Sequence, residues 1–260
     1  MSDRILLLET LAFDAWPAEE VVELGGWRLR FNRGLTNRAN SVWPNAWRGD
    51  DALADRIQRV EECSAERGLP ALFQVTPVAL PHDLDAVLAK RGYLGHLSTE
   101  VWTAPALRDD LGTTAADVEV VVSEEIEREW WKLNGERGRF RDEERPLYRA
   151  LLERLRGRSC FVLARHRGVA AATGVGVAAG DRVGIFSMRT VEELRGRGLA
   201  RAVLAGIARY ARERGATELY LQVERDNAPA RSLYAKSGFA VAYAYHYRRR
   251  AVAARSAGSR

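Results

Sequence analysis

The sequence predicts a mixed α/β (α+β) fold in which helices flank a mostly antiparallel central sheet, built as two similar halves. Short apolar runs of strand length alternate with segments whose apolar residues recur every three or four positions, as in amphipathic helices. A loop rich in glycine and arginine follows a strand-like run near residue 190 and opens a helix-like segment. The order helix, strand, helix, strand occurs at residues 67–93 and again at 214–239, which indicates an internal repeat.

The composition is typical of a globular protein with one or two domains. Of the 260 residues, 47% are hydrophobic and 29% are charged. No apolar run approaches the length of a membrane span, and acids interrupt the apolar patch near the N-terminus, which argues against a signal peptide. Cys63 and Cys160 lie far apart and the four histidines are scattered, so we expect no disulfide framework and no metal site. These features predict a protein of the reducing cytoplasm with no membrane partner.

The basic character of the chain raises the question of a nucleic-acid surface. The net charge is +5 and the isoelectric point is near 9.5. Arginine carries nearly all of the basic charge, and many arginines neighbour acidic residues on helix-like segments. This pattern favours solvated, ion-paired faces and argues against a nucleic-acid partner.

The first half repeats the scaffold of the second. Residues 67–93 and 214–239 align with an offset of 146–148 positions, and the same offset predicts a helix at residues 52–67. The alternative is a coincidence between two units of similar length. Five of the seven tryptophans lie in the first half, where we expect them to fill the core or an interdomain face rather than a substrate pocket.

The first half lacks the residues that would carry chemistry. At the same offset, Asp51 stands where the second half has Gly198, and Leu88 stands where it has Tyr234. Adjacent carboxylates, Asp50 and Asp51, suit a helix N-terminus but would repel a phosphate. The boundary between the halves falls at residues 105–114.

The second half predicts a strand, two helices and a run of three antiparallel strands before the Gly- and Arg-rich segment. Residues 167–168 and 179–181 are the expected hairpin turns, and a further Gly- and Arg-rich loop at residues 134–140 separates the two helices. The strands are expected at residues 118–122, 160–164, 169–178 and 183–190, and the helices at residues 124–133 and 143–155.

The segment Arg195-Gly-Arg-Gly-Leu-Ala200 has the composition of a phosphate-binding loop. Its glycines allow a tight turn that brings backbone N–H groups against a ligand. The helix that follows adds unpaired N–H groups and a partial positive charge at its N-terminus. The segment therefore predicts a pyrophosphate site, the alternative being a helix-capping turn on a solvated face. The apolar stripe of the helix consists of Leu199, Val203, Ile207 and Ala211.

A second motif follows. Residues 218–224 are predicted as a strand, Asn227-Ala-Pro-Ala as a helix start with proline just inside it, and Gly238 as its stop. The order strand, Arg-x-x-Gly-x-Ala, helix, strand, Asn-x-x-Ala-x-x-Leu-Tyr-x-x-x-Gly-Phe, strand resembles the Gcn5-related N-acetyltransferase (GNAT) family over residues 117–250.

The first half resembles the degenerate half of tandem GNAT proteins. The likeness is strongest to an actinobacterial group that carries the segments found here as Gly26-Trp-Arg-Leu-Arg30 and Thr36-Asn-Arg-Ala-Asn-Ser-Val42. The resemblance implies two GNAT-like domains, a degenerate one at residues 1–110 and a catalytic one at residues 115–250. Residues 251–260 are expected to form a flexible tail.

The resemblance implies that acetyl-CoA binds the second domain as cosubstrate. Backbone groups of Met188 and Thr190, on either side of Arg189, would pair with the pantetheine arm. Asn227 would hydrogen-bond the arm, a role compatible with capping its own helix. Glu192 replaces a proline that is common in the family, at a position on which no backbone contact depends. The N–H groups that would hold the pyrophosphate are those of Arg195, Gly196, Arg197, Gly198, Leu199 and Ala200.

Tyr234 matches the usual general acid of the family. A phenol is protonated at neutral pH and can give its proton to a departing thiolate; the alternative is a tyrosine that only packs in the core. The base stays open. Gln222 stands where some family members carry glutamate, but its neutral amide cannot take a proton. Glu224 lies two residues further on and on the same strand face, so it is a candidate for the general base. Ser187 with a water relay is another route.

The sequence thus predicts an N-acetyltransferase that moves an acetyl group from acetyl-CoA to a primary amine by direct attack. The acceptor is a small molecule or a protein, and a homodimer is compatible with the sequence. A non-catalytic acyl-CoA sensor is the alternative, because no clear base is present. A protein associated with nucleic acid is a third reading, which rests on the basic isoelectric point alone.

Overall fold

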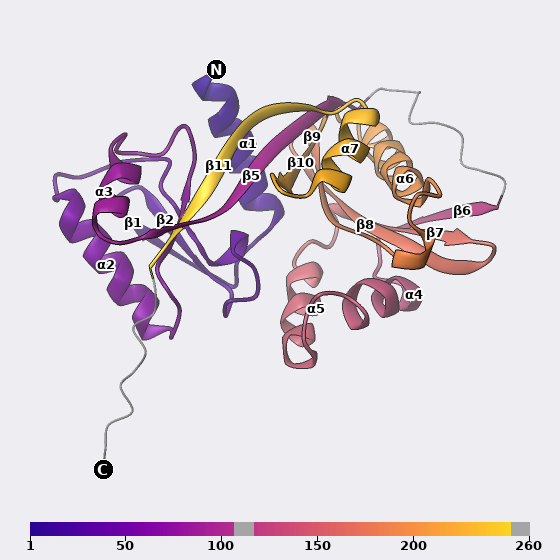
Figure 1. Cartoon of the computed structure of the whole chain (residues 1–260), viewed down its shortest axis with the longest axis horizontal. Coiled ribbons are helices and arrows are strands. Elements are labelled where there is room, and N and C mark those ends of the chain that lie inside the picture. The colour runs from indigo at the N-terminus through magenta and orange to yellow at the C-terminus, as the bar shows by residue number, and fades with distance from the viewer. Residues whose placement is uncertain (107–116, 251–260) are drawn as a thin grey trace, which may run out of the picture. The chain divides into compact units, whose positions relative to one another are not determined.

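The computed structural model describes residues 1–106 and 117–250, which form two compact units (Figure 1). We call the first the large unit; it comprises Asp3–Pro17 and Thr99–Ala244. The second, the small unit, comprises Ala18–Ser98 and, of the described residues at the C-terminal end, residues 245–250. The predicted tail at residues 251–260 and most of the predicted boundary lie outside the described residues.

The large unit contains a mixed sheet with the strand order β5-β10-β9-β8-β7-β6. Neighbouring strands run antiparallel except β9 and β10, which are parallel and are joined by helix α6 as a crossover. The strands are β5 (Leu94–Pro105), β6 (Val118–Ser123), β7 (Ser159–His166), β8 (Val169–Ala179), β9 (Arg182–Thr190) and β10 (Glu218–Glu224). The helices are α1 (Ser2–Ala15), α4 (Arg128–Trp131), α5 (Arg145–Glu153), α6 (Leu199–Glu213) and α7 (Ala228–Lys236).

The core of the large unit forms where α6 packs on the sheet. The predicted apolar stripe of this helix is buried, with Leu199 1% exposed and the other three residues fully buried. Gly206 lets the helix approach closely, because a Cβ there would lie 2.8 Å from the Val162 side chain. Period-3.6 burial on one face is the expected result of an amphipathic sequence. The prediction of this helix is confirmed.

The small unit contains the strands β1 (Glu20–Leu24), β2 (Trp27–Phe31), β3 (Val42–Trp43) and β4 (Leu72–Val75), with the helices α2 (Leu53–Glu66) and α3 (Leu84–Lys90). β3 and β4 are parallel, as β9 and β10 are in the large unit. Trp27 is fully buried and packs edge-on against Phe73. Its burial agrees with a core role for the tryptophans.

Each compact unit contains strand residues that the sequence repeat assigns to the other half of the chain. β5 follows α3 in sequence, yet its residues from Thr99 pair along the whole of β10. The last strand, β11 (Ala240–Arg249), follows α7, and its end pairs with β4 of the small unit. The compact units therefore do not follow the predicted domain boundary near residue 110. The division into domains at residues 1–110 and 115–250 stays a prediction about ancestry and function.

Two elements differ from the sequence-based expectation. The helix expected at residues 124–133 begins only at Arg128. Before it, the Ser123 hydroxyl accepts a hydrogen bond from the Glu125 N–H (3.0 Å), a local bond that competes with helix formation. The helix then widens into a π-helix, η3 (Lys132–Glu136). Helix α1 was not expected; it buries Leu8 and Glu9, and the Glu9 carboxylate accepts a hydrogen bond from the Tyr243 hydroxyl (2.6 Å).

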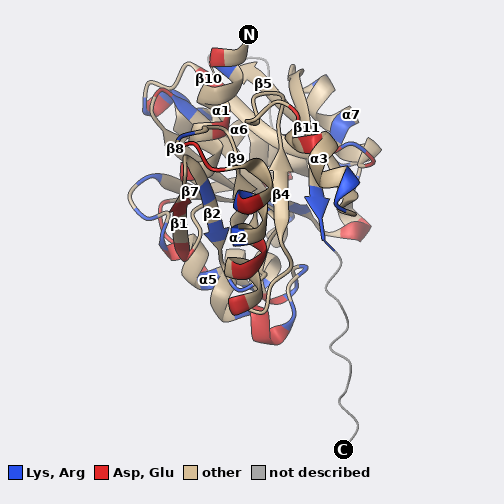
Figure 2. Ribbon diagram, turned by 90° about the vertical axis from the view of Figure 1, so that its left-hand side faces the viewer, with Lys and Arg blue, Asp and Glu red and all other residues tan. Residues whose placement is uncertain are grey.

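Charged residues of both signs are interspersed along the ribbons of the described chain (Figure 2). The exposed arginines make many short-range pairs with acids, such as Arg149 with Glu153 (3.0 Å) and Arg33 with Glu19 (2.6 Å). Pairs of this kind are the expected consequence of an arginine-rich, acid-rich surface and contribute little stability each.

Candidate active site

The Arg195–Ala200 segment forms an open turn between β9 and α6. After β9 the chain makes one 3₁₀ turn, η5 (Glu192–Leu194). Gly196 and Gly198 then both adopt φ = +77°, in the left-handed region that glycine enters without strain. A Cβ at either position would meet no heavy atom of the described residues within 4 Å. The turn therefore needs glycine for its backbone shape, and the space in front of it is available to a ligand.

Helix α6 points its N-terminus at this turn. Gly198 is the N-cap, and its carbonyl accepts the first helical hydrogen bond, from Ala202 N (3.0 Å). The N–H groups of Leu199 and Ala200 precede that bond and have no intrahelical acceptor. The Leu199 side chain is buried and anchors the turn to the core. A helix N-terminus with exposed arginines beside it is an anion-binding arrangement.

Two of the arginines flank the turn at its surface. Arg195 pairs with Glu192 at 3.1 Å, and its side chain is 65% exposed. Arg197 is exposed between the two glycines. Both can turn toward a bound anion at low cost, because exposed ion pairs are weak.

Strands β9 and β10 separate just before the turn. Their parallel pairing ends at Ile185 and Leu221, although both strands continue. The amide of Val191 donates to Ala171 O on the β8 side (2.9 Å). Because N–H and C=O groups alternate in direction along a strand, Thr190 and Met188 present theirs to the opposite, open side. These are the two residues expected to pair with a pantetheine arm.

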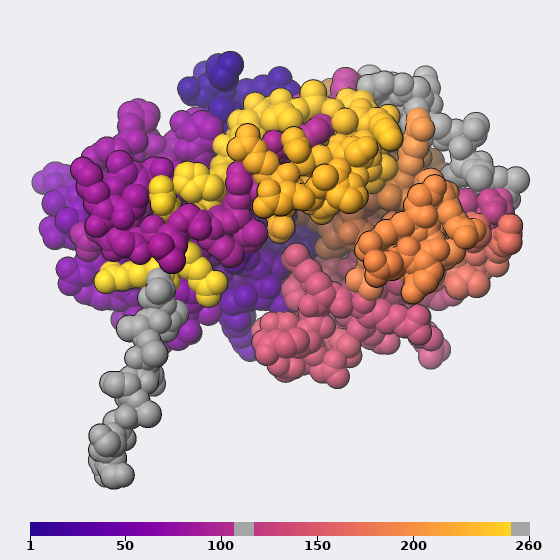
Figure 3. All heavy atoms as spheres, in the orientation of Figure 1, coloured from indigo at the N-terminus to yellow at the C-terminus, as the bar shows by residue number. Residues whose placement is uncertain are grey.

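Tyr234 lies on α7 and is 7% exposed. It belongs to the same core cluster as Leu199, and Met188 packs against that cluster. Burial raises the pKa of the Tyr234 phenol to about 12. No described residue is hydrogen-bonded to its hydroxyl, so the phenol proton is available to a ligand. Figure 3 shows the gold atoms of α7 at the surface of this unit.

Asn227 and Glu224 frame the start of α7. Asn227 is the N-cap, and its Oδ1 accepts a hydrogen bond from Ala230 N (3.2 Å). Glu224 is exposed at the end of β10, opposite Thr99 of β5. Gln222, two residues earlier on the same face, is half-buried. The structure thus places Asn227 as a cap and leaves the Glu224 carboxylate in solvent at the strand end.

The sequence analysis missed a buried carboxylate that holds α7. Glu100 on β5 is 4% exposed and accepts hydrogen bonds from Arg231 Nε (2.9 Å) and Trp102 Nε1 (3.0 Å). Arg231 lies one helical turn before Tyr234, so this pair fixes the helix that carries the phenol. Nothing local in the sequence marks Glu100, because its partner is 131 positions away.

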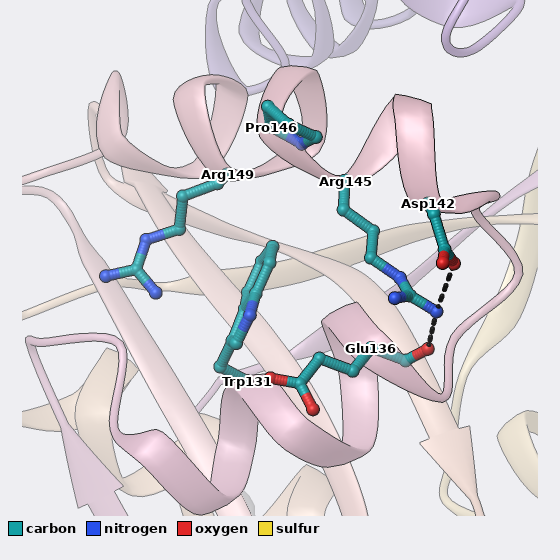
Figure 4. Close-up of a pocket in the computed structure, with 6 residues that line it drawn as sticks. All are labelled: Trp131, Glu136, Asp142, Arg145, Pro146 and Arg149. Atoms are coloured by element: carbon teal, nitrogen blue, oxygen red, sulfur yellow. Dashed lines mark hydrogen bonds and ion pairs between the residues drawn. The ribbon is translucent and has the colours of Figure 1, made fainter.

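A hollow of about 440 Å³ lies between α4 and α5 (Figure 4). Arg149 stacks over the Trp131 ring at 5.1 Å. Arg145 pairs with Asp142 (2.8 Å) and donates to the backbone oxygen of Glu136 (2.5 Å). The hollow therefore combines an aromatic face with both signs of charge. Its lining residues are Trp131, Glu136, Asp142, Arg145, Pro146 and Arg149.

The corresponding turn in the small unit is closed by its own side chains. Asp51, the counterpart of Gly198, pairs with the fully buried Arg56. Arg56 also donates to the backbone oxygens of Gly25 and Arg48 (2.6 Å each). The hydrogen bond from Arg56 lowers the pKa of Asp51 to about 2, so the carboxylate stays charged. A second phosphate is disfavoured here.

Two negative findings apply to residues 1–106 and 117–250. They contain no group of three or more His, Cys, Asp or Glu side chains that could hold a metal ion. Within the same ranges, no helix has both the length and the apolar character needed to cross a membrane.

Comparison with known proteins identifies relatives of this chain. The profile of the family described as "Probable histone acetyltransferase Rv0428c C-terminal" matches residues 3–251. An "Uncharacterized N-acetyltransferase YobR" of Bacillus subtilis (strain 168) is 31% identical over 253 residues, covering 95% of this chain and 98% of that protein.

Solved structures share the fold. A GCN5-related N-acetyltransferase from Kribbella flavida superposes with a TM-score of 0.71 at 15% identity, covering 97% of this chain and 95% of that chain. A tandem GNAT protein from the clavulanic acid biosynthesis pathway superposes with a TM-score of 0.60 at 16% identity, covering 76% and 69%. With the profile match over almost the whole chain, these findings establish that the chain belongs to the Gcn5-related N-acetyltransferase family.

Proposed function

We propose that the protein transfers an acetyl group from acetyl-CoA to a primary amine, by direct attack of the amine on the thioester. The observation that supports this most is the separation of β9 from β10 directly before the open Gly196–Gly198 turn. An extended arm with a pyrophosphate at its end fits this combination of an open strand edge and a helix N-terminus. Acetyl-CoA is such a molecule, and it supplies the activated acetyl group.

The residues divide into those that bind and one that handles a proton. The N–H groups of the Arg195–Ala200 turn would hold the pyrophosphate, and the backbone of Met188 and Thr190 would hold the pantetheine arm. Asn227 would contribute only as far as its capping role allows, since its Oδ1 is already engaged. As the C–N bond forms and the C–S bond breaks, Tyr234 would donate to the departing thiolate.

Glu224 is our candidate for the group that takes the proton from the attacking amine. It lies in solvent at the end of β10, where its carboxylate is accessible to an amine or to a water molecule. Ser187 is a weaker candidate, because its Oγ lies 2.8 Å from the hydroxyl of the buried Tyr148.

The direct test is release of CoA thiol from acetyl-CoA in the presence of a panel of primary amines. Small amines, amino acids, aminoglycosides and lysine peptides should be compared with a reaction that lacks an amine. We expect release that depends on the amine and saturates with it. Acetyl-CoA binding without such release from any class of amine would favour the non-catalytic sensor instead.

The small unit should bind no second acetyl-CoA. Asp51 and its partner Arg56 fill the turn that corresponds to the Arg195–Ala200 segment, and Leu88 stands where the phenol would be needed. Titration calorimetry with acetyl-CoA should therefore return one site per chain. Two equivalent sites would contradict the view that the first half is degenerate.

A further inference from the structure

The point where β9 leaves β10 is marked by a β-bulge. Thr173 of β8 pairs with Arg189 and Val175 pairs with Phe186, so Ser187 and Met188 together face the single residue Gly174. Ser187 adopts φ = +50°, which is uncommon for a residue with a side chain. Such a conformation persists only when its surroundings hold it in place.

Three buried side chains hold this bulge from the α4–α5 side. Trp130 Nε1 donates to the backbone oxygen of Gly174 (3.2 Å). Asn134 Nδ2 donates to the backbone oxygen of Ser187 (2.7 Å). The Tyr148 hydroxyl lies 2.8 Å from Ser187 Oγ and 2.8 Å from Asn134 Oδ1. All three side chains are more than nine-tenths buried.

The polar atoms of Asn134 and Tyr148 are all used in this cluster. A phenol has one proton, so it donates to Asn134 Oδ1 and accepts from the Ser187 hydroxyl. The second Nδ2 proton of Asn134 goes to Thr173 Oγ1 (2.7 Å). A buried network with every member satisfied specifies one arrangement, because any other leaves a polar group unpaired.

The cluster changes the direction of one backbone carbonyl. In a regular strand, Ser187 O would point in the plane of the sheet toward a neighbouring strand. Here it is taken by Asn134, which comes from the π-helix η3. By the alternation that turns Met188 and Thr190 to the open edge, the Ser187 carbonyl belongs to the β8 side of β9, so the bond from Asn134 fixes the strand at its bulge. Met188 and Thr190 follow on the edge where pairing with β10 has already ended, at Ile185.

We propose that Asn134 and Tyr148 are positioning residues that lock the β9 bulge and so set where the backbone of Met188 and Thr190 meets the pantetheine arm. This rests on the proposed function, since it concerns the same cosubstrate. The two residues touch neither the reacting atoms nor the pyrophosphate turn. Their effect should thus be confined to the part of the ligand that lies along β9.

The test compares two probes: acetyl-CoA, and 3′-phosphoadenosine 5′-diphosphate, which carries the pyrophosphate but no pantetheine arm. Tyr148→Phe and Ser187→Ala each remove the hydrogen bond between the phenol and the bulge. Each should weaken acetyl-CoA binding by roughly three- to tenfold, the usual worth of one hydrogen bond, and leave binding of the nucleotide unchanged. Tyr148→Phe also removes the bond to Asn134 Oδ1, so the double variant should bind no more weakly than Tyr148→Phe alone, which already lacks the bond that Ser187→Ala deletes.

Thr173→Val is the matched control. It keeps the shape of the side chain and removes a partner of Asn134 that is not part of the bulge. It should lower the melting temperature without changing the ratio of the two affinities. If Tyr148→Phe does not fold, Ser187→Ala carries the test, because it removes only one half-buried hydroxyl.

Three outcomes overturn the proposal. Equal weakening of both probes would mean that the cluster only stabilises the fold. Unchanged acetyl-CoA affinity in folded variants would mean that the bulge is held without it. If the wild-type protein binds neither probe, the proposed function fails and the positioning role with it.

Discussion

Replacing Tyr234 with phenylalanine is expected to lower kcat by about 10²-fold, the lower range for loss of a general acid. The ring and its packing against Phe239 (5.9 Å between centroids) are retained. The hydroxyl has no hydrogen-bond partner among the described residues, so the free energy of unfolding should fall by no more than about 1 kcal/mol. Acetyl-CoA affinity should stay similar, because the Arg195–Ala200 turn is untouched. The measurement is kcat with one common amine acceptor.

The pKa of Tyr234 also predicts how kcat depends on pH. A phenol with a pKa of about 12 holds its proton throughout the range in which enzymes are assayed, so wild-type kcat should show no loss below about pH 10 that depends on this residue. Tyr210→Phe is the matched control. It removes another buried hydroxyl of the same core from the far end of α6, and it should keep full turnover. Full turnover in Tyr234→Phe would leave Tyr234 as a core residue only.

Replacing Gly198 with aspartate is expected to abolish the stabilisation that acetyl-CoA confers. At a ligand concentration of 100 times Kd, binding stabilises the folded state by about 2.7 kcal/mol. For a chain of this size that corresponds to a rise in melting temperature of about 5–10 °C. A carboxylate at position 198 would stand against the pyrophosphate, where the small unit carries Asp51.

Gly198→Asn separates charge from backbone strain. Asparagine has the size of aspartate and tolerates the left-handed conformation that Gly198 adopts, with φ = +77°. The open space around Gly198 accepts either side chain. The asparagine variant should keep a thermal shift that the aspartate variant loses. A wild-type shift in the aspartate variant would show that the ligand binds elsewhere.

Much of the large unit was predictable from local sequence patterns. Strand β10 has the bounds expected from its apolar run, and the apolar stripe of α6 is buried as its period predicts. The positive φ angles of Gly196 and Gly198 follow from glycines placed where a strand turns into a helix. The burial of Tyr234 follows from its place on α7. Each of these features depends on residues that are neighbours in sequence.

The roles of individual site residues were less predictable. The sequence offered Asn227, Glu224 and Ser187 as chemical candidates. In the structure Asn227 caps its own helix and Ser187 makes a partly buried hydrogen bond to Tyr148. Polar side chains acquire their partners only when distant segments meet. The same applies to Asn134. It lies in a stretch expected to be a loop, and its side chain meets the β9 bulge only in the folded chain.

By itself, the sequence determined the family, the order of helices and strands, and the turn suited to a pyrophosphate, because periodicity and glycine placement act over a few residues. Only the tertiary structure decided that β5 completes the sheet beside β10, that Glu100 holds α7 through Arg231, and that buried side chains from η3 and α5 bind the bulge of β9. These contacts join residues 39 to 131 positions apart. Their free energy depends on burial and on satisfied hydrogen bonds, which exist only once the chain has folded.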